Sequence, residues 1–298
     1  MEGMDYLVRG VTEDNEFRFA ASTTTGLSNE ARRRHATASG ATKILGETMT
    51  AVTLLGTQLK GDEKISIQIT ANGPVRGIIA DVDAAGNVRG FIDNPQVYAE
   101  LPDAPGGPPP LGHEGLILVM RSTPGTVISR GTVAIVEGDI ARDMMSYLAT
   151  SEQTLSAMAL HADLAIDRSL SASCGILLQA LPNADKEKFA AYKSVLAHPQ
   201  LRARVLAGTP EEAVETLMNA VTHESPYAIL ARQELRFQCT CSREKVADMI
   251  RMIGRDEIAQ MRDEDGQAEI TCRFCNERYV LDRAELGVLL ANLGNRPN

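Results

Sequence analysis

The sequence lacks tryptophan, and aromatic residues make up only 4% of its 298 residues. Apolar residues reach 44%, so a sizeable core can form, but it has to be built mainly from aliphatic side chains and methionine. No apolar run approaches the roughly 18 residues that a membrane-spanning helix requires. The first residues, MEGMDYLVRG, also lack the apolar stretch of a secretory signal. We therefore expect a cytoplasmic protein without a membrane partner.

A positive net charge is also missing, because 30 Lys and Arg residues are outnumbered by 39 Asp and Glu residues. The net charge of −9 argues against a protein that mainly coats nucleic acid or anionic lipid. Residues 232–298 are densely charged but balanced, with 11 basic and 12 acidic residues. No glycine-rich phosphate-binding loop is present. We therefore expect neither a nucleic acid nor a nucleotide as partner.

Residues 1–181 combine strand and helix patterns, which predicts an α+β domain with mixed sheet and helices. A long helix is predicted from about Asn29 to Leu59, because apolar residues recur there at helical spacing. Asp139 is placed to cap a further short helix. Residues 102–112, rich in proline and glycine, can form neither a helix nor a central strand. The predicted strands include 6–13, 16–23, 65–69, 77–83, 88–93, 116–120 and 126–136.

The pattern changes at residues 182–231, which predict short amphipathic helices. One of these helices is expected to end at Pro199. Another is expected to begin at Thr209, because Thr209 and Glu212 have the spacing of a capping box. Short isolated helices are only marginally stable in water. This segment therefore needs a neighbouring apolar surface on which to pack.

Residues 232–298 form a third predicted part. Ser242 begins a helix, and Asp282 opens the last helix through a capping box. Strands are predicted at 267–271 and 278–281. Since a C-x-x-C motif lies between them, we expect a hairpin that carries two cysteines at its turn.

Four of the five cysteines are concentrated in this third part, as C-x-C at Cys239 and Cys241 and as C-x-x-C at Cys272 and Cys275. Clustered thiols in a reducing compartment are more often metal ligands than structural disulfides. Zn²⁺ is bound tetrahedrally by four thiolates, and two paired motifs supply such a set. The sequence therefore predicts one zinc ion per chain. Cys174 stands alone in an apolar stretch and is predicted to be a small buried side chain.

The C-x-C spacing differs from an ordinary zinc ribbon, which tends to have C-x-x-C on both sides. A disulfide between Cys239 and Cys241 would close a small strained ring, and strained exposed disulfides are readily reduced. Nearby basic residues would favour thiolates, or would simply form a solvated charged surface. These residues are Arg236, Arg243, Lys245, Arg273 and Arg278. The spacing therefore favours a redox-regulated site over a permanent structural one.

Such a site has two states with different stabilities. A bound zinc ion contributes folding free energy, about 10–16 kcal/mol in zinc-finger peptides. Oxidised thiols no longer bind the metal, and a segment of about 65 residues is close to the lower limit for folding alone. We therefore expect metal loss to unfold residues 232–298. Docking of residues 182–231 would then weaken and expose apolar surface.

Two other functions remain open on these residues alone. One is a zinc ribbon that binds nucleic acid or works in translation, which the balanced charge and few aromatic residues disfavour. The other is an oxidoreductase that uses Cys272 and Cys275. A C-x-x-C motif permits that chemistry, but the βαβ context of a thioredoxin-like enzyme is missing.

The cysteine motifs and their surroundings resemble a known family. FQCTCSREKVADMI and EDGQAEITCRFCNERYVLDRAEL are similar to the zinc domain of the redox-regulated 33-kilodalton heat-shock chaperones, the bacterial oxidative-stress holdases. KGDEKISIQITANGPVRGIIADVDAAGNVRGFI, MMSYLATSEQ and GILLQALPNAD resemble the N-terminal domain of that family. The resemblance therefore covers nearly the whole chain.

The resemblance implies a molecule of three parts. Residues 1–181 would form an α+β domain that interacts with substrate and dimerises. Residues 182–231 would form a helical, redox-sensitive linker, and residues 232–298 a small four-cysteine zinc domain that acts as the redox switch.

The resemblance also implies how the switch operates. The reduced, zinc-bound form would be inactive. Oxidation would join Cys239 to Cys241 and Cys272 to Cys275, release zinc and unfold the linker. The resulting homodimer would bind unfolding client proteins without ATP and without catalytic residues.

Overall fold

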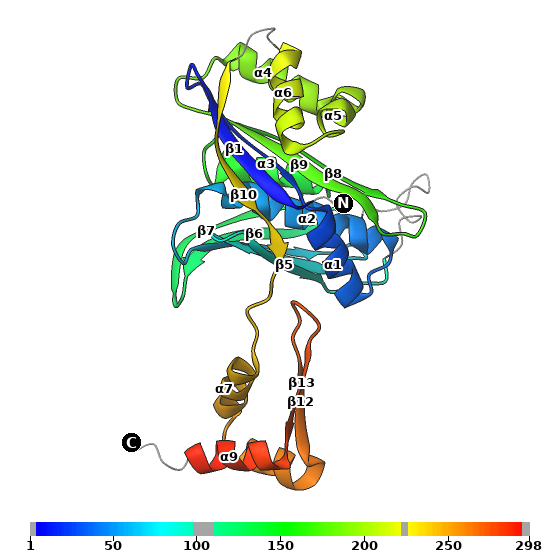
Figure 1. Cartoon of the computed structure of the whole chain (residues 1–298), viewed down its shortest axis with the longest axis vertical. Helices are drawn as coiled ribbons and strands as arrows, with labels where there is room; N and C mark the ends of the chain where they lie inside the picture. The colour runs from blue at the N-terminus through cyan, green and yellow to red at the C-terminus, as the bar shows by residue number, and fades with distance from the viewer. Residues whose placement is uncertain (1–3, 98–109, 222–225, 294–298) are drawn as a thin grey trace. The chain divides into compact units, whose positions relative to one another are not determined.

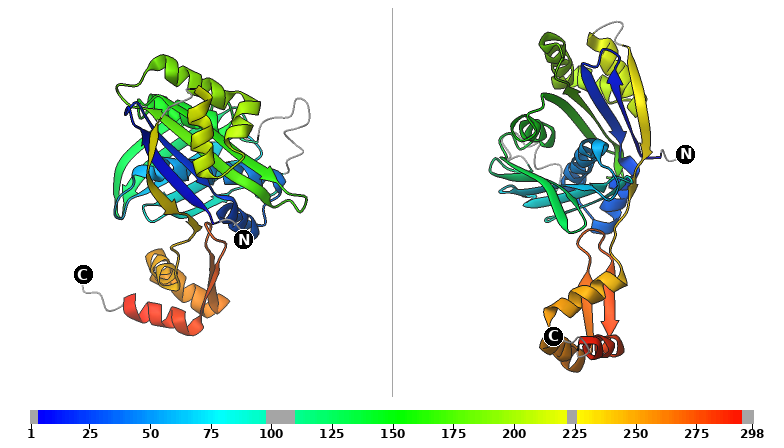
Figure 2. Two further views of the ribbon diagram at one scale, coloured as in Figure 1. Left: turned by 45° about the horizontal axis from the view of Figure 1, so that its top comes forward. Right: turned by 90° about the vertical axis from the view of Figure 1, so that its left-hand side faces the viewer.

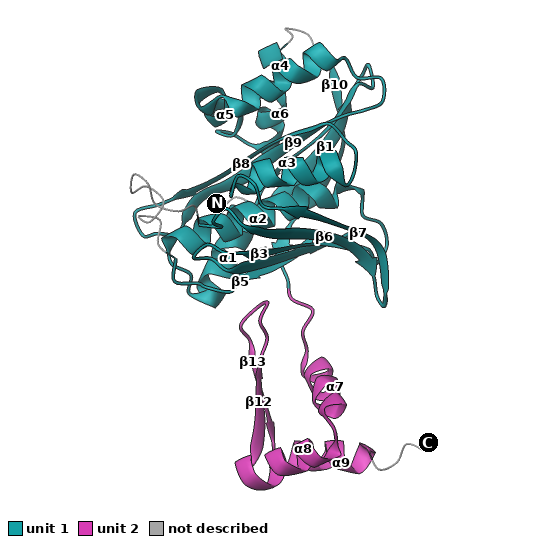
Figure 3. Ribbon diagram, turned by 180° about the vertical axis from the view of Figure 1, so that it is seen from behind, with its two compact units in different colours: residues 1–238 teal, residues 239–298 magenta. Residues whose placement is uncertain are grey.

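Contacts in the computed structural model divide the chain into two compact units (Figure 3). Unit 1 comprises residues 1–238 and unit 2 comprises residues 239–298. The structure describes residues 4–97, 110–221 and 226–293. The proline- and glycine-rich stretch at 102–112 therefore lies largely outside the described residues. Both units mix helices and strands, which confirms the α+β class predicted from the sequence.

Sheet A of unit 1 has five antiparallel strands in the order β10–β1–β2–β9–β8. They are β10 (Tyr227–Glu234), β1 (Tyr6–Thr12), β2 (Phe17–Thr23), β9 (Leu170–Ala180) and β8 (Ser156–Leu164). Strands β1 and β2, both predicted from the sequence, form a hairpin, and Asn15 adopts a positive φ of 54° in its turn. Sheet A therefore joins the beginning and the end of unit 1.

Sheet B has six strands in the order β11–β5–β4–β3–β6–β7. They are β11 (Arg236–Phe237), β5 (Asn87–Ile92), β4 (Gly77–Asp83), β3 (Lys64–Ala71), β6 (Gly115–Thr123) and β7 (Thr126–Ala134). Neighbouring strands are antiparallel except for β11, which runs parallel to β5. Gly86, in the turn between β4 and β5, has a φ of 81°, and a Cβ there would collide with the carbonyl oxygen of Glu234. Glycine is therefore needed where β10 passes this turn.

Helix α2 (Ser39–Leu55) lies between the two sheets and is buried on nearly all sides (Figures 1 and 2). A helix that is buried all round needs either apolar side chains or polar ones that find partners inside the protein. The threonines of α2 meet this need by donating back along the helix. Thr48 Oγ1, for example, donates to the Ile44 carbonyl oxygen at 2.7 Å.

The single long helix predicted from about Asn29 to Leu59 is wrong, because the chain forms two helices there. Helix α1 (Thr25–His35) ends at Ala36, which has a positive φ of 49° and donates its N–H to the Arg32 carbonyl. The 3₁₀ turn η1 (Gly56–Gln58) follows α2. A helix does begin after Asp139 as predicted, since the Asp139 carboxylate accepts from the Arg142 N–H at 2.9 Å and caps α3 (Ile140–Thr150).

Helices α4 (Lys186–Ala197), α5 (Pro199–Val205) and α6 (Pro210–Val221) cover the face of sheet A that points away from α2 (Figure 1). Side chains of β2 alternate between the two cores: Phe17 packs beneath these helices and Ala20 packs toward α2. The Phe17 ring meets the fully buried Tyr192 ring edge-on, with centroids 5.4 Å apart. The amphipathic helices therefore rest on an apolar sheet face.

The helix boundaries in this segment follow the sequence signals. Thr209 N–H donates to Glu212 Oε2 at 2.7 Å, and Glu212 N–H donates to Thr209 Oγ1 at 3.3 Å, which confirms the capping box. Pro199 ends α4 as predicted, but it also begins α5 directly, because proline suits the first position of a helix.

The end of the segment predicted as helical differs from the expectation. Residues 227–231 belong to β10, an edge strand of sheet A. Strand β10 pairs antiparallel with β1, so that Tyr6 lies opposite Glu234. Because this partner comes from the other end of the unit, no neighbouring sequence signal indicates the pairing.

Unit 2 is small and has a small core. It contains α7 (Arg243–Ile253), α8 (Arg255–Gln260), the π-helical turn η2 (Met261–Asp265), β12 (Gln267–Thr271), β13 (Arg278–Asp282) and α9 (Arg283–Leu293). The predicted hairpin, β12 paired antiparallel with β13, is confirmed. Ser242 caps α7, and Asp282 forms reciprocal hydrogen bonds with Glu285, as expected. The buried core comprises Val246, Ile250, Ile258, Ala268, Leu281, Leu286, Leu289 and Leu290.

Within the residues that the structure describes, no helix combines the length and the apolar character needed to cross a membrane.

Candidate metal centre

The C-x-C cysteines lie in an irregular stretch immediately before α7. Cys241 is followed by Ser242, whose Oγ accepts from the Lys245 N–H at 3.3 Å and fixes the start of the helix. Lys245 Nζ also donates to the Thr240 carbonyl oxygen at 2.6 Å. Hydrogen bonds from the first turn of α7 therefore hold the backbone that carries Cys239 and Cys241.

The C-x-x-C cysteines lie in the tight turn that connects β12 with β13. The Cys272 N–H donates to the Glu277 carbonyl at 2.9 Å, and the Asn276 N–H donates to the Cys272 carbonyl at 2.8 Å. Asn276 adopts a positive φ of 58°, a conformation that asparagine tolerates better than most residues. The two cysteines therefore lie at the turn of the hairpin, as the sequence predicted, and the turn brings their sulfurs within 4.8 Å of each other.

The structure brings the two motifs together into one cluster. Cys239 Sγ lies 3.7 Å from Cys272 Sγ, and Cys241 Sγ lies 3.3 Å from Cys275 Sγ. All four sulfur atoms lie within 4.8 Å of one another. Four sulfurs bound tetrahedrally at the usual Zn–S distance of about 2.3 Å would be about 3.8 Å apart. The cluster is therefore positioned to hold one metal ion.

Burial sets the acid–base properties of the thiols. Cys275 is buried, with 4% of its surface exposed, and the other three cysteines are half-buried. Burial raises the pKa of the Cys275 and Cys241 thiols above the usual value, because it penalises the charged form. A bound cation reverses this preference, since a coordinating thiol is deprotonated outright. Thiolates are therefore unfavourable in this cluster unless a cation is bound to them.

The basic residues near the thiols are largely engaged by other groups. Arg243 makes three hydrogen bonds to the Glu285 carboxylate: Nη2 donates to each oxygen at 2.7 Å, and Nε donates to Oε1 at 2.9 Å. Arg278 forms an ion pair with Glu269. The expectation that such residues favour thiolates is therefore weakened for Arg243 and Arg278, whose charges are balanced by carboxylates.

A residue that the sequence did not single out also contacts the cluster. Tyr279, on β13, donates its hydroxyl to Cys241 Sγ at 3.1 Å. This hydrogen bond raises the pKa of the Tyr279 hydroxyl above its usual value. Its position four residues after Cys275 gives no signal by itself, because only the hairpin geometry brings the ring back across to the C-x-C motif.

Replacing Tyr279 with phenylalanine should weaken metal binding about tenfold, measured with Zn²⁺ as the probe, since partners that hydrogen-bond metal ligands commonly contribute 10- to 100-fold to affinity. Competition with a chromogenic zinc chelator measures the change. Tyr227→Phe, which removes a hydroxyl from β10 in unit 1, is the control and should leave the affinity unchanged. Equal affinities of the two variants would show that the Tyr279 hydroxyl does not support the cluster.

The fifth cysteine lies away from the cluster, in sheet A of unit 1. Cys174, on β9, is half-buried and donates to the Leu206 carbonyl oxygen at 3.5 Å. Burial raises the pKa of its thiol to about 11. Cys174 is therefore mostly protonated near neutral pH. The sequence predicted a small buried side chain, and the structure leaves it only half-buried.

Known proteins match this chain over nearly its whole length. The sequence matches the family described as Hsp33 protein over residues 5–282. It is 38% identical to the 33 kDa chaperonin of Bacillus licheniformis over 292 residues, which cover 96% of this chain and 99% of the relative. It is 36% identical to the 33 kDa chaperonin of Bacillus subtilis over 289 residues, which cover 95% of this chain and 97% of the relative.

The fold is shared with a solved structure. The crystal structure of the 33 kDa chaperonin from Thermotoga maritima matches with a TM-score of 0.84 and 24% sequence identity, covering 99% of this chain and 100% of that chain. The sequence matches span both units, including all four clustered cysteines. The resemblance inferred from the cysteine motifs is therefore confirmed, and the chain belongs to the Hsp33 family of chaperones.

Proposed function

We propose that the chain is a redox-regulated holdase, a chaperone that binds unfolding client proteins without ATP and prevents their aggregation. In the reduced state, Cys239, Cys241, Cys272 and Cys275 hold one zinc ion and the protein is inactive. The observation that carries this proposal is the convergence of four sulfurs within 4.8 Å in a unit with a small core. The family membership supports the chaperone activity itself.

The proposed switch is the oxidation of these four cysteines. Each disulfide forms when two thiolates give two electrons to one peroxide molecule, which takes up two protons and becomes two molecules of water. Two peroxide molecules therefore convert four thiolates into two disulfides. Disulfide sulfurs carry no negative charge, so the four oxidised cysteines no longer bind the zinc ion.

The proposed pairs are Cys239 with Cys241 and Cys272 with Cys275, each within one motif. The closest sulfurs, however, belong to different motifs, since Cys239 lies near Cys272 and Cys241 near Cys275. A disulfide between motifs would tie the start of α7 to the hairpin and stabilise unit 2. Disulfides within motifs leave the C-x-C and C-x-x-C motifs free to separate. Only this pairing is compatible with unfolding of unit 2.

The proposed response is the release of a helical linker. We assign residues 1–181 to substrate interaction and dimerisation, residues 182–231 to the redox-sensitive linker and residues 232–298 to the zinc switch. Helices α4–α6 cover an apolar face of sheet A that includes Phe17 and Ile176. If these helices detach, that face becomes available to apolar segments of unfolding clients and to a second copy of the chain in a homodimer. We place this activity in the cytoplasm, where thiols are kept reduced until oxidative stress.

The test follows three quantities during titration with hydrogen peroxide at mildly raised temperature. These are zinc released to a chromogenic chelator, suppression of aggregation of an unfolding client, and proteolytic cleavage within residues 182–221. All three should rise together, and a reductant with zinc should reverse them. Disulfide mapping by mass spectrometry should find pairs within motifs. Client protection by the reduced, zinc-loaded protein, or cleavage that stays unchanged after zinc release, would refute the switch.

A further inference from the structure

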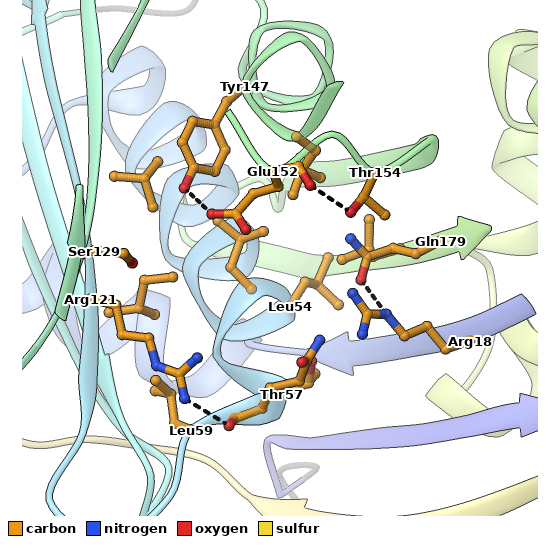
Figure 4. A pocket seen from close by; sticks show the side chains of 16 residues that line it. Arg18, Leu54, Thr57, Leu59, Arg121, Ser129, Tyr147, Glu152, Thr154 and Gln179 are labelled. Carbon is orange, nitrogen blue, oxygen red and sulfur yellow. Dashed lines mark hydrogen bonds between the residues drawn. The ribbon is translucent and has the colours of Figure 1, made fainter. Parts of the chain in front are cut away.

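A cavity in unit 1 lies where the two sheets meet the end of α2 (Figure 4). Sheet A contributes Arg18 and Gln179, sheet B contributes Arg121, and the end of α3 and the loop after it contribute Tyr147 and Glu152. The volume is about 140 Å³. A cavity of about 150 Å³ can hold one benzene ring. This cavity has a similar volume and a lining of both polar and apolar side chains, so it suits a small organic molecule with both kinds of group.

Arg18 is the first charged group of this cavity. Its Nε donates to Gln179 Oε1 at 2.9 Å. With the Gln58 amide oriented so that its oxygen faces Arg18, Nη1 and Nη2 donate to it at 2.7 and 3.1 Å. Among the described residues, Arg18 has no carboxylate at ion-pair distance, and burial lowers the pKa of the guanidinium. A partly buried cation held only by neutral amides is a place where an anionic group would be stabilised.

Glu152 is the second charged group, and it has the opposite sign. One of its oxygens accepts from the Tyr147 hydroxyl at 2.6 Å (Figure 4). In the part of the chain that the structure describes, no cation lies at ion-pair distance from Glu152, although it interacts electrostatically with Arg18. The cavity therefore presents one positive and one negative group that are not in contact with each other.

Arg121 adds an unused donor. Its Nη2 donates to Glu63 Oε2 at 2.5 Å and to the Gln58 carbonyl at 3.3 Å, so that its charge is balanced. Its Nε is buried and has no hydrogen-bond partner among the described residues. A buried donor without a partner usually indicates a missing acceptor, since such donors are costly.

The remaining wall is mixed, with polar side chains (Thr57, Gln58, Ser129 and Thr154) beside a group of aliphatic ones. The aliphatic side chains come from α2, from the residue after η1, from α3 and from both sheets: Leu54, Leu55, Leu59, Leu148, Ile65, Val119 and Leu177. A neighbouring cavity of about 390 Å³ shares Arg18, Thr57, Gln58, Leu177 and Gln179 with the first. The second cavity reaches Leu230, which is 63% exposed, and provides a route from the surface.

We propose that this cavity binds a small zwitterion with an apolar body, of the size and chemistry of an aliphatic α-amino acid. The carboxylate is held by Arg18 and the free Nε of Arg121, the ammonium group by Glu152, and the apolar side chain by the aliphatic wall. A ligand with both charges leaves the net charge of the cavity unchanged, which neither a simple carboxylic acid nor a simple amine does. This inference does not depend on the redox switch.

The test compares ligands that differ by one charged group, using isothermal titration calorimetry with the reduced full-length protein. L-Leucine should bind saturably. Leucinamide, which lacks the carboxylate, and 4-methylpentanoate, which lacks the ammonium group, should each bind at least about tenfold more weakly, as expected for loss of a charge-assisted hydrogen bond. No saturation by leucine up to about 10 mM, or equal binding of 4-methylpentanoate, would overturn the proposal.

Two substitutions complete the test. Arg18→Gln and Glu152→Gln should each weaken leucine binding by at least about tenfold. Glu152 is exposed, so its replacement by glutamine should not disturb folding even if Arg18→Gln does. Glu137→Gln, which removes an exposed carboxylate from outside both cavities, is the matched control and should bind leucine like the unmodified protein. Unchanged leucine binding by Glu152→Gln would overturn the assignment of the ammonium site.

Discussion

Replacing Cys275 with serine should unfold unit 2 and leave the two-sheet unit folded. Cys275 is the most buried of the four clustered cysteines, and serine is a poor ligand for zinc. The metal contributes folding free energy of about 10–16 kcal/mol in comparable small sites, whereas the core of unit 2 consists of only a few aliphatic side chains. Loss of the metal should therefore remove more free energy than this core can supply.

Hydrogen exchange followed by mass spectrometry can measure this outcome for each unit separately. Amides of β12 and β13 should lose protection in Cys275→Ser, and zinc content should fall well below one ion per chain. Cys174→Ser is the matched control, because it removes a thiol from sheet A, and it should retain zinc and hairpin protection. Stoichiometric zinc with a protected hairpin in Cys275→Ser would contradict the four-ligand site.

Replacing Tyr192 with alanine should detach helices α4–α6 and activate the chaperone without oxidation. Tyr192 is fully buried and packs edge-on against Phe17 of sheet A. Truncation of a large buried aromatic side chain costs about 3–5 kcal/mol. The free energy that docks three short helices on one sheet face is small, so a loss of this size should leave much of the population undocked.

The measurement is suppression of client aggregation by the reduced, zinc-loaded variant, together with proteolysis of residues 182–221. The variant should protect the client and be cleaved in this segment. Leu201→Ala on α5 is the control, because Leu201 is 36% exposed and its truncation should change neither quantity appreciably. A Tyr192→Ala protein that is cleaved but inactive would separate helix release from client binding and refute the proposed client surface.

The sequence predicted those features whose signals are local. Capping residues are an example, because Thr209 and Glu212 form their reciprocal hydrogen bonds within a single helical turn. The hairpin of unit 2 is another, since β12 and β13 are separated only by the short turn that carries C-x-x-C. The metal cluster was predictable for a chemical reason: few other roles need four thiols in two closely spaced pairs.

Features that depend on distant partners were not predictable. The start of β10 was assigned to a helical segment because its partner, β1, lies at the opposite end of unit 1. The break between α1 and α2 depends on Ala36 adopting a left-handed conformation, for which alanine gives no signal. Tyr279 was missed at the site because its contact with Cys241 exists only after the hairpin folds back.

The position of β10 has a consequence for how far a disturbance can spread along the backbone. This strand lies between α6 and the first clustered cysteine, and seven of its eight residues are paired with β1, Leu230 being skipped at an irregularity in the register. If the chain unfolds from Cys239 toward the N-terminus, β10 has to separate from β1 before α6 is affected. We therefore expect the ladder to set a threshold: a small or brief loss of order near Cys239 should leave α6 docked, and only a loss that separates β10 from β1 should reach the helices.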